Sequence, residues 1–124
     1  MTTLLNAARA AATGMDAQSM RLRLLSENIA NADTPGFQRK IATFQLHEDG
    51  VGLGPVRLDD RAGERVFDPG HPLADATGHY ESSNVDLVLE LADAREAQRS
   101  YEANLRIFDQ ARQMAQSLFD LIRR

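Results

Sequence analysis

Two groups of residues in this sequence have types and spacings that could bind a ligand. The run GVGLGP, residues 50–55, has the glycine content of a phosphate-binding loop, but it ends in Pro55 and no helix N-terminus is predicted to receive an anion. His47, His71 and His79 could meet around a metal ion, yet His71 lies between glycine and proline in a predicted turn, and nothing sets metal spacing. We therefore predict no cofactor, no metal site and no small-molecule substrate.

A third group, Asp68, His71 and Asp75, could in principle exchange protons with a substrate. No paired nucleophile and no oxyanion-stabilising device accompanies these residues, so the sequence predicts that the protein is not an enzyme. The chain also contains no cysteine, which excludes a thiolate nucleophile, a disulfide framework and cysteine-ligated metal clusters.

Length and charge exclude further classes. The chain has 124 residues, enough for one domain, and its net charge of -4 with 14 scattered Lys and Arg gives no basic footprint for nucleic acid. Charged residues recur through the N-terminal segment from Arg9 to Glu27, so it is predicted to be neither a signal peptide nor a membrane span.

The elements that must position any function fall into three parts. Residues 3–32 contain no proline and one glycine, which favours a helix. Residues 33–82 contain all four prolines and seven of the eight glycines, which predicts a small β-rich insert with short strands in RKIATFQL, PVRL and ERVF. Residues 83–124 predict one helix of about 40 residues, opened by a capping-box-like Ser83. We expect residues 1–32 together with 83–124 to form a terminal helical domain, and residues 33–82 to form the insert.

Apolar residues alternate at spacings of four and three in both predicted helices. The first series is Leu4, Ala8, Ala11, Met15, Gln18, Leu22, Leu25 and Ile29; the second is Ala94, Ala97, Tyr101, Asn104, Phe108, Ala111, Ala115, Leu118 and Ile122. Such seams predict that the helices pair as a coiled-coil-like hairpin, so the predicted fold class is mainly α with a small β-rich insert. We expect the inter-helix core to contain Leu22, Ile29, Tyr101, Asn104, Phe108, Ala111, Ala115 and Leu118.

Asn104 is the lone polar member of the second seam, and two interpretations are open. It is either a tolerated polar residue at a partly exposed position or a buried asparagine that fixes the register of the helix pair.

Both helices carry more apolar residues than one partner helix needs. Ile107, Met114 and Leu121 form a second stripe about 100° from Phe108, and Met20 falls opposite the first seam. The insert could fold back over these stripes, but it lacks a continuous apolar face large enough to cover both helices. We therefore expect the ends to be poorly ordered in the isolated chain and to contact adjacent subunits through Met20, Leu24, Asn28, Asn31, Ile107, Met114 and Leu121.

The joint after the first helix combines several backbone signals. Asn28 and Asn31 can offer side-chain amides to nearby backbone, Pro35 biases Thr34 away from helix, and Gly36 permits a sharp exit. We expect this joint to stop the helix at a fixed angle.

With these parts in place, the sequence resembles the axial rod and hook proteins of the bacterial flagellum over nearly its whole length. The N-terminal resemblance rests on Asn28, Ala30, Asn31, Ala32, Thr34, Pro35, Gly36 and Phe37. The C-terminal resemblance rests on the block RSYEAN, which contains Tyr101 and Asn104. A loop with Asp68, Pro69 and Pro72 is similar to one that separates one proximal-rod member from the other rod subunits. The insert is short for this family.

The resemblance implies a structural subunit of the periplasm-spanning proximal rod, which polymerises through its terminal helices into a torque-transmitting shaft. It also implies export by the flagellar type III apparatus without a cleaved signal peptide. The implied partners are other rod proteins, further copies of the chain, and membrane-ring or export-gate proteins at the rod base. Another rod subunit of the same family, or a soluble helical adaptor or export chaperone, remains the alternative.

Overall fold

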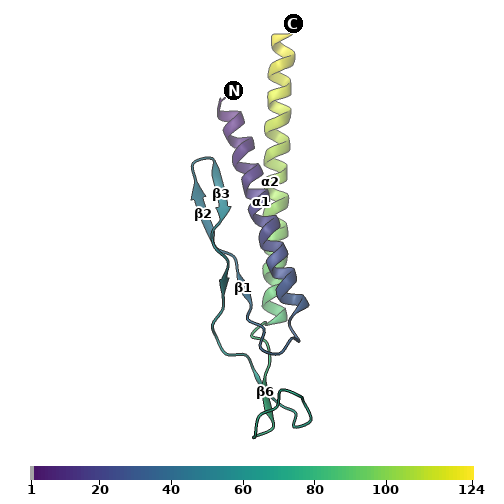
Figure 1. Ribbon diagram of the computed structural model, residues 1–124. Helices are drawn as coiled ribbons and strands as arrows, with labels where there is room; N and C mark the ends of the chain where they lie inside the picture. Colours follow the sequence, from purple (N-terminus) through teal and green to yellow (C-terminus); the bar gives the residue numbers. More distant parts are fainter. Residues whose placement is uncertain (1) are drawn as a thin grey trace.

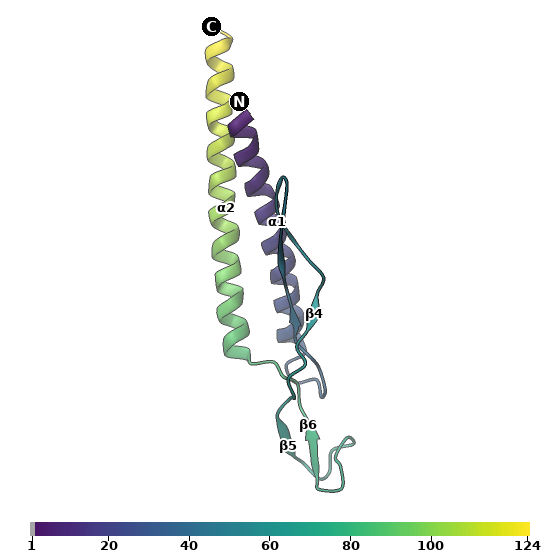
Figure 2. The same ribbon diagram turned by 90° about the vertical axis from the view of Figure 1, so that its left-hand side faces the viewer.

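Two long antiparallel helices joined by a β-rich insert make up the protein (Figure 1). The structure, a computed structural model, describes residues 2–124. Helix α1 spans Thr2–Ala30 and helix α2 spans Leu87–Ile122. The helices lie side by side, and the last turns of α2 extend beyond the start of α1 in both views (Figures 1 and 2). The predicted fold class is confirmed.

Short strands in the insert form three antiparallel pairs. Their bounds are β1 Lys40–Ile41, β2 Phe44–His47, β3 Gly50–Leu53, β4 Arg57–Leu58, β5 Arg65–Phe67 and β6 His79–Glu81. β1 pairs with β4, β2 with β3, and β5 with β6. The three predicted strand runs contain β1, β2, β4 and β5, whereas β3 and β6 were not predicted. β3 was missed because its glycines, which weaken strand propensity, favoured a loop.

Small residues bring the two helices close together. The buried apolar residues of the pair are Ala11, Ala17, Leu25, Ala97 and Ala111. At Gly14 a Cβ atom would lie 2.8 Å from the Asn104 Nδ2, so the asparagine occupies space that only glycine leaves free. The Asn104 amide also donates to the Ser100 carbonyl at 3.0 Å. Asn104 is therefore a half-buried residue at the helix-helix contact rather than a solvent-facing one.

Helix α2 begins later than the sequence indicated. Its N-cap is Asp86, whose carboxylate accepts from the backbone N–H groups of Val88 at 3.0 Å and Leu89 at 3.5 Å. The expectation that Ser83 opens the helix is wrong, because its hydroxyl donates instead to the Ala32 carbonyl. Ser83 thus ties the end of α1 to the segment before α2.

The β2–β3 hairpin lies along α1 (Figures 1 and 2). The Thr13 hydroxyl accepts from the Val51 N–H at 3.3 Å, and Gly50 has φ +145, where a side chain would meet Thr13. The Arg21 guanidinium lies 5.9 Å from the centre of the Phe44 ring. The hairpin therefore covers part of α1, while the insert does not reach the C-terminal half of α2 (Figures 1 and 2).

Many large apolar side chains remain exposed on the described residues. They include Met20, Ile107, Met114, Leu121 and Ile122 on the helices and Leu46 on the hairpin. Within residues 2–124, neither helix combines the length and hydropathy that a membrane crossing requires.

Candidate functional site

Asn28 fastens the end of α1 to the start of the insert. Its side chain is 0% exposed, its Nδ2 donates to the Lys40 carbonyl at 2.9 Å, and its Oδ1 accepts from the Lys40 N–H at 2.8 Å. The Asn28 amide thus bonds both backbone polar groups of Lys40, as a neighbouring strand would, and holds the chain after the joint against the end of α1. Three residues further along, the Asn31 amide donates to the Glu27 carbonyl at 2.9 Å and closes the last turn of α1.

The joint itself turns at Gly36, as the sequence predicted. Gly36 has φ +74, a left-handed conformation that glycine adopts without steric cost. Its N–H donates to the Glu81 carbonyl at 3.1 Å, which brings the exit of α1 against β6.

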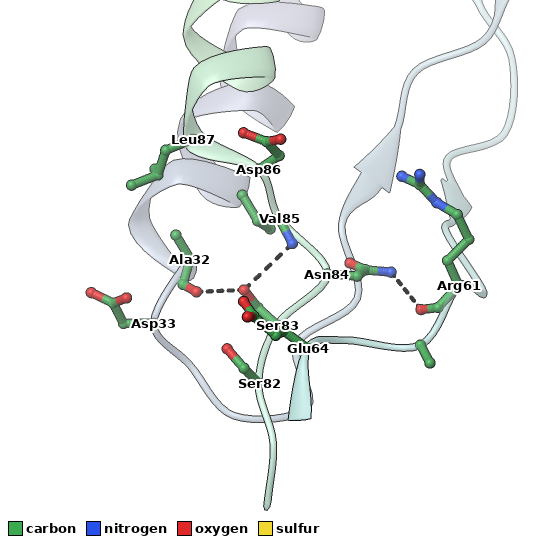
Figure 3. Close-up of a pocket in the computed structure, with 11 residues that line it drawn as sticks. Ala32, Asp33, Arg61, Glu64, Ser82, Ser83, Asn84, Val85, Asp86 and Leu87 are labelled. Carbon is green, nitrogen blue, oxygen red and sulfur yellow. Dashed lines mark hydrogen bonds between the residues drawn. The ribbon is translucent and has the colours of Figure 1, made fainter. Parts of the chain in front are cut away.

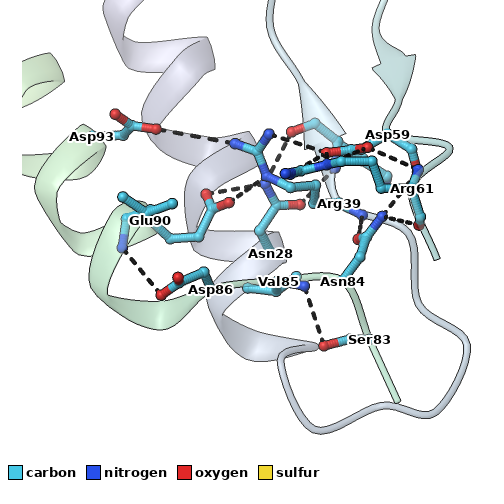
Figure 4. Close-up of polar contacts among 12 residues, drawn as sticks. Asn28, Arg39, Asp59, Arg61, Ser83, Asn84, Val85, Asp86, Glu90 and Asp93 are labelled. Atoms are coloured by element: carbon cyan, nitrogen blue, oxygen red, sulfur yellow. Dashed lines mark hydrogen bonds and ion pairs between the residues drawn. The ribbon is translucent and has the colours of Figure 1, made fainter. Parts of the chain in front are cut away.

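A buried carboxylate connects α2 to this joint (Figure 4). Glu90 is 1% exposed, and its Oε1 accepts from the Arg39 Nε at 2.6 Å while its Oε2 accepts from the Asn28 Nδ2 at 3.3 Å. The Arg39 guanidinium also lies 3.6 Å from the Asp59 carboxylate and 4.0 Å from the Asp93 carboxylate. Arg39 of the insert therefore pairs with Glu90 of α2, and Glu90 in turn accepts a hydrogen bond from Asn28 of α1. We call Asn28, Arg39, Asp59, Asn84 and Glu90 the polar junction.

Asp59 and Asn84 complete the polar junction. Hydrogen bonds from the Arg61 side chain hold the pKa of the Asp59 carboxyl well below its ordinary value, and the Arg39 charge adds to the effect. The Asn84 Oδ1 accepts from the Arg39 N–H at 2.7 Å, and its Nδ2 donates to the Asp59 and Arg61 carbonyls, both at 2.9 Å. Every polar group in this set has a partner, which is the condition under which a buried polar network rigidifies a structure.

An open pocket of about 520 Å³ lies below the helix pair (Figure 3). Ala32, Val85 and Leu87 supply apolar walls, and three carboxylates line it, those of Asp33, Glu64 and Asp86. The only cation among its lining residues is Arg61, whose Nη2 pairs with Asp59 at 2.7 Å. No lining residue is a histidine, a lysine or a cysteine. The pocket is an acidic, partly apolar surface.

The structure separates the residues that could have bound a ligand. His47 lies in β2 and His79 in β6, at opposite ends of the insert, while the His71 ring stacks on Tyr80 with ring centres 3.9 Å apart (Figure 1). Residues 2–124 contain no group of three His, Asp or Glu side chains placed to hold a metal. Residues 50–53 of the glycine-rich run form β3, not a loop before a helix.

Asp75 organises its own loop instead of forming an acid–base cluster. Its Oδ1 accepts from the Thr77 hydroxyl at 2.6 Å and from the His79 N–H at 3.1 Å, and its Oδ2 pairs with Arg65 at 2.7 Å. The Thr77 hydroxyl, followed by the His79 N–H, lowers the pKa of the Asp75 carboxyl below its ordinary range. His71 donates its backbone N–H to the Asp68 carbonyl at 3.0 Å, a turn bond.

The residues predicted for the inter-helix core differ in how far they are covered. Ala111 is buried, and Leu118 is exposed. The remaining six are half-buried: Leu22, Ile29, Tyr101, Asn104, Phe108 and Ala115. Near this end, Leu4, Leu5 and Ala8 of α1 and Phe108, Ala111, Ala115 and Phe119 of α2 line an apolar groove of about 310 Å³.

Two of the residues predicted to meet neighbouring subunits are placed elsewhere. Asn28 is buried within the polar junction, so its side chain has no exposed surface in this structure. Leu24 is half-buried and lines a small pocket with Ile41 of β1, because the insert runs past that face of α1. Asn31 is half-buried, whereas Met20, Ile107, Met114 and Leu121 are exposed.

A further apolar surface was missed by the sequence analysis. Leu87, Val88, Leu89 and Leu91 surround the first turns of α2 and are all exposed. Glu90, the residue between them, points inward to Arg39. The sequence run LVLEL would ordinarily be interpreted with its aliphatic residues buried and its glutamate exposed. In the structure the glutamate is buried and the four aliphatic residues are exposed.

Comparison with known proteins identifies the family. A model described as "Flagella basal body rod protein" matches residues 9–38, which cover most of α1 and the joint. A second model, "Flagellar basal body rod FlgEFG protein C-terminal", matches residues 76–121, which include β6 and nearly all of α2. Asn28 of the polar junction lies in the first matched segment and Asn84 and Glu90 lie in the second, while Arg39 and Asp59 lie between the two.

Similar proteins match along almost the whole chain. The flagellar basal-body rod protein FlgC of Agrobacterium fabrum is 41% identical over 136 aligned positions, covering 99% of this chain and 98% of that protein. The FlgC protein of Escherichia coli O6:H1 is 35% identical, covering 90% and 92%. The FlgC protein of Aquifex aeolicus is 30% identical, covering 97% and 98%. With a paired-helix scaffold, exposed apolar helix faces and these matches, the chain belongs to the FlgC family of flagellar basal-body rod proteins.

Proposed function

We propose that the chain, a structural subunit of the flagellar basal-body rod, joins its neighbours through the exposed apolar faces of α1 and α2. The observation that carries this proposal is the stripe of Ile107, Met114 and Leu121, which are 51%, 51% and 62% exposed on one side of α2. Soluble monomers rarely expose a row of large apolar residues, whereas a subunit of an assembly gains free energy by burying them against its neighbours.

The stripe is exposed on the flank of α2, about 100° around the helix from Phe108, which lines the groove against α1. Residues seven apart lie nearly above one another on a helix, so a row at this spacing can meet a second helix along its length. Gln110, Gln113 and Ser117, which lie between its members, line an open surface with Met114 and Leu118. A helix from an adjacent subunit would therefore meet an apolar line with polar residues at its margin, the usual composition of an interface.

The arrangement suits torque transmission. Contacts between different surfaces of successive subunits generate a helical assembly when their rotation does not close into a ring. Long helices packed on both sides give such an assembly stiffness. In this proposal residues 1–32 and 83–124 form the rod-core domain, and residues 33–82 form an outer insert whose angle is set by the polar junction. The chain acts by assembly and not by catalysis.

Assembly in the rod requires that the subunit leave the cytoplasm. We propose export through the flagellar type III apparatus without a cleaved signal, and contacts with export-gate or membrane-ring proteins at the rod base. Exposed apolar faces support a chain that is delivered incompletely ordered and completes its packing at the growing end. The predicted soluble adaptor or chaperone is the weaker alternative, because the similar proteins carry the names of rod proteins.

The proposal is tested by placing a charge in the stripe. Ile107→Asp and Met114→Asp should each abolish swimming in a strain that has no other copy, because a buried unpaired carboxylate opposes subunit contact. The subunit should still be found among the secreted proteins. Gln98→Asp is the matched control, since it adds the same charge at an exposed polar position of the same helix about 180° from Ile107, and this variant should swim. Normal swimming of both stripe variants would refute the proposed interface.

A further inference from the structure

The β2–β3 hairpin has one edge that α1 covers and one edge that is open. At the covered edge, the Val51 N–H of β3 donates to the Thr13 hydroxyl of α1 at 3.3 Å. Nearer the end of the same helix, Asn28 bonds both backbone polar groups of Lys40 in β1. β2 lies on the side of the hairpin away from α1 (Figure 1), and all its residues are exposed. Side chains of α1 thus complete the inner edge of the insert, whereas the edge along β2 has no partner among residues 2–124.

The register of the hairpin determines which backbone groups point to the open edge. In an antiparallel pair, residues that bond across the ladder alternate with residues whose N–H and carbonyl groups point outward. Val51 points outward, to Thr13, so Leu46 opposite it points outward on the other side. Phe44, two residues earlier, has the same orientation. The open edge therefore presents an N–H and a carbonyl from each of two residues, which lie ~7 Å apart along an extended strand.

β2 also lacks the features by which proteins protect an open edge. Residues 44–47 include no proline and no lysine, and their pairing with β3 continues without a bulge. Phe44 and Leu46 extend from one face of the strand, and Leu46 is 87% exposed. Such an edge is a template for another strand and not for a helix, because only an extended backbone repeats its polar groups at this spacing.

The surroundings of Leu46 indicate what chemistry the added strand should have. Leu46 lines an open cleft of about 850 Å³ between the hairpin and the N-terminal part of α1. Glu48, Asp49 and Arg9 also line this cleft, and among residues 2–124 none of the three belongs to an ion pair. The two carboxylates outnumber the one guanidinium, which favours a basic residue in the partner beside the hairpin turn.

We propose that β2 binds an extended segment of a different protein by strand addition. The segment has an aliphatic side chain at every second position, which covers Phe44 and Leu46, and a lysine or arginine beside the turn. It has no proline where its backbone N–H groups donate to β2. A second copy is a poorer occupant, because residues 44–53 of its hairpin contain no lysine or arginine. This inference rests on the proposed function, in which the insert lies on the outside of the rod, where such a segment can reach it.

Hydrogen exchange tests the contact at the groups that would make it. The purified full-length chain and isolated basal bodies are compared by mass spectrometry at residue resolution. The Phe44 and Leu46 amides should exchange close to the intrinsic rate in the purified chain and at least about tenfold more slowly in basal bodies. The Gln45 and His47 amides, which bond to β3, are the internal control and should be protected in both samples. Equal exchange of Phe44 and Leu46 in the two samples would overturn the proposal.

A lysine on the edge separates strand addition from simple burial. Leu46→Lys keeps every backbone N–H but places an ammonium group on the face that the added strand must cover, so protection of the Phe44 amide should fall by about fivefold or more. Leu73→Lys, the same change at an exposed leucine outside the strands, should leave that protection unchanged. Each variant is expressed beside the wild-type chain, so that basal bodies form in either case, and its peptides are distinguished by mass. Full protection in Leu46→Lys would contradict strand addition.

The absence of cysteine from the sequence permits a test for a second copy in the same place. Leu46→Cys is oxidised in isolated basal bodies, and the proposal predicts that the chain stays largely unlinked to other copies of itself. A predominant disulfide-linked dimer would show that another copy occupies the edge, which would overturn the proposal. None of these outcomes alters the swimming test on Ile107 and Met114, so failure of the strand contact is distinguishable from failure of the proposed function.

Discussion

Glu90 is a carboxylate within an aliphatic run, and its inward position determines which neighbours face solvent. Burying a charge is costly unless it is paired and hydrogen-bonded, and the contacts to Arg39 and Asn28 supply both conditions. Because Glu90 is held inside, Leu87, Val88 and Leu91 must lie outside. Glu90 thus couples the stability of the polar junction to the exposure of these aliphatic side chains.

Removal of Glu90 should destabilise the protein strongly. Glu90→Ala leaves the half-buried Arg39 without its shortest ion pair, and loss of one member of a buried pair typically costs about 3 kcal/mol or more. Glu90→Gln keeps the shape and most of the hydrogen bonds and should cost less. Glu96→Ala is the control, because its contact with Arg21 is longer, 3.4 Å, and exposed, so its cost should stay below about 1 kcal/mol. Urea denaturation measures all three; equal costs for Glu90→Ala and Glu96→Ala would contradict the described junction.

Gly14 and Asn104 should be energetically coupled across the helix pair. Gly14→Ala gains about 1 kcal/mol of helix propensity, but the new methyl group would overlap Asn104, and such overpacking typically costs 1–3 kcal/mol, roughly. We therefore expect Gly14→Ala to destabilise the native chain and to stabilise a chain that already carries Asn104→Ala. A double-mutant cycle of unfolding free energies measures this sign change, and equal effects in both backgrounds would exclude the contact.

The contacts of some residues, but not of others, could be predicted from the sequence. The amide contacts of Asn28 and Asn31 with nearby backbone and the turn at Gly36 followed from local spacing. The role of Glu90 did not, because its partner Arg39 is 51 positions away in the sequence and no local pattern reports such a pairing. For the same reason Asn28 was expected at a subunit contact and is buried instead.

At the scale of elements, the polar junction fixes the orientation of the insert relative to the helices. Few apolar residues hold the insert in place, and three separate strand pairs without a common sheet are marginal on their own. Ion pairs and amide bonds at the base of the helices therefore carry much of the attachment. That attachment should depend on pH.

Acidification should loosen the insert before it melts the helices. The pKa of Asp59 is lowered chiefly by Arg61, and that of Glu27 chiefly by Lys40. A carboxyl whose pKa is lower in the folded than in the unfolded state contributes stability above its unfolded pKa, about 4, and this contribution is lost as pH falls below that value. Below pH ~4, the protection of the Arg39 and Lys40 amides against hydrogen exchange, measured relative to the intrinsic rate at each pH, should fall, while the middle of α2 stays protected. Asp59→Asn should weaken this acid dependence; an unchanged dependence would contradict the assignment.

Helices could be predicted better than strands. The absence of proline and the alternating apolar spacing are properties of single segments, and they gave both helices to within a few residues. β3 and β6 depend on partners: β6 pairs with β5 across the loop at residues 68–78, and β3 contains two glycines that indicate a turn when the segment is considered alone.

For the whole molecule, the decisive property is apolar surface that the chain does not cover by itself. The insert contacts α1 at Thr13, yet Ile107, Met114, Leu121 and Ile122 of α2 remain exposed. That α2 would expose apolar surface could be predicted from the spacing of its apolar residues, because one partner helix cannot bury two apolar stripes. Which part of α2 is exposed could not be predicted, since it depends on how far α2 extends past α1.

Electron microscopy of basal bodies tests the central claim most directly. The strain compared with wild type carries Ile107→Asp and Met114→Asp in its only copy of this chain, and secretion of the subunit is verified first. If the outer stripe of α2 joins subunits, the isolated particles will have membrane rings without a completed rod. Rods of normal length in that strain would show that assembly does not use this surface.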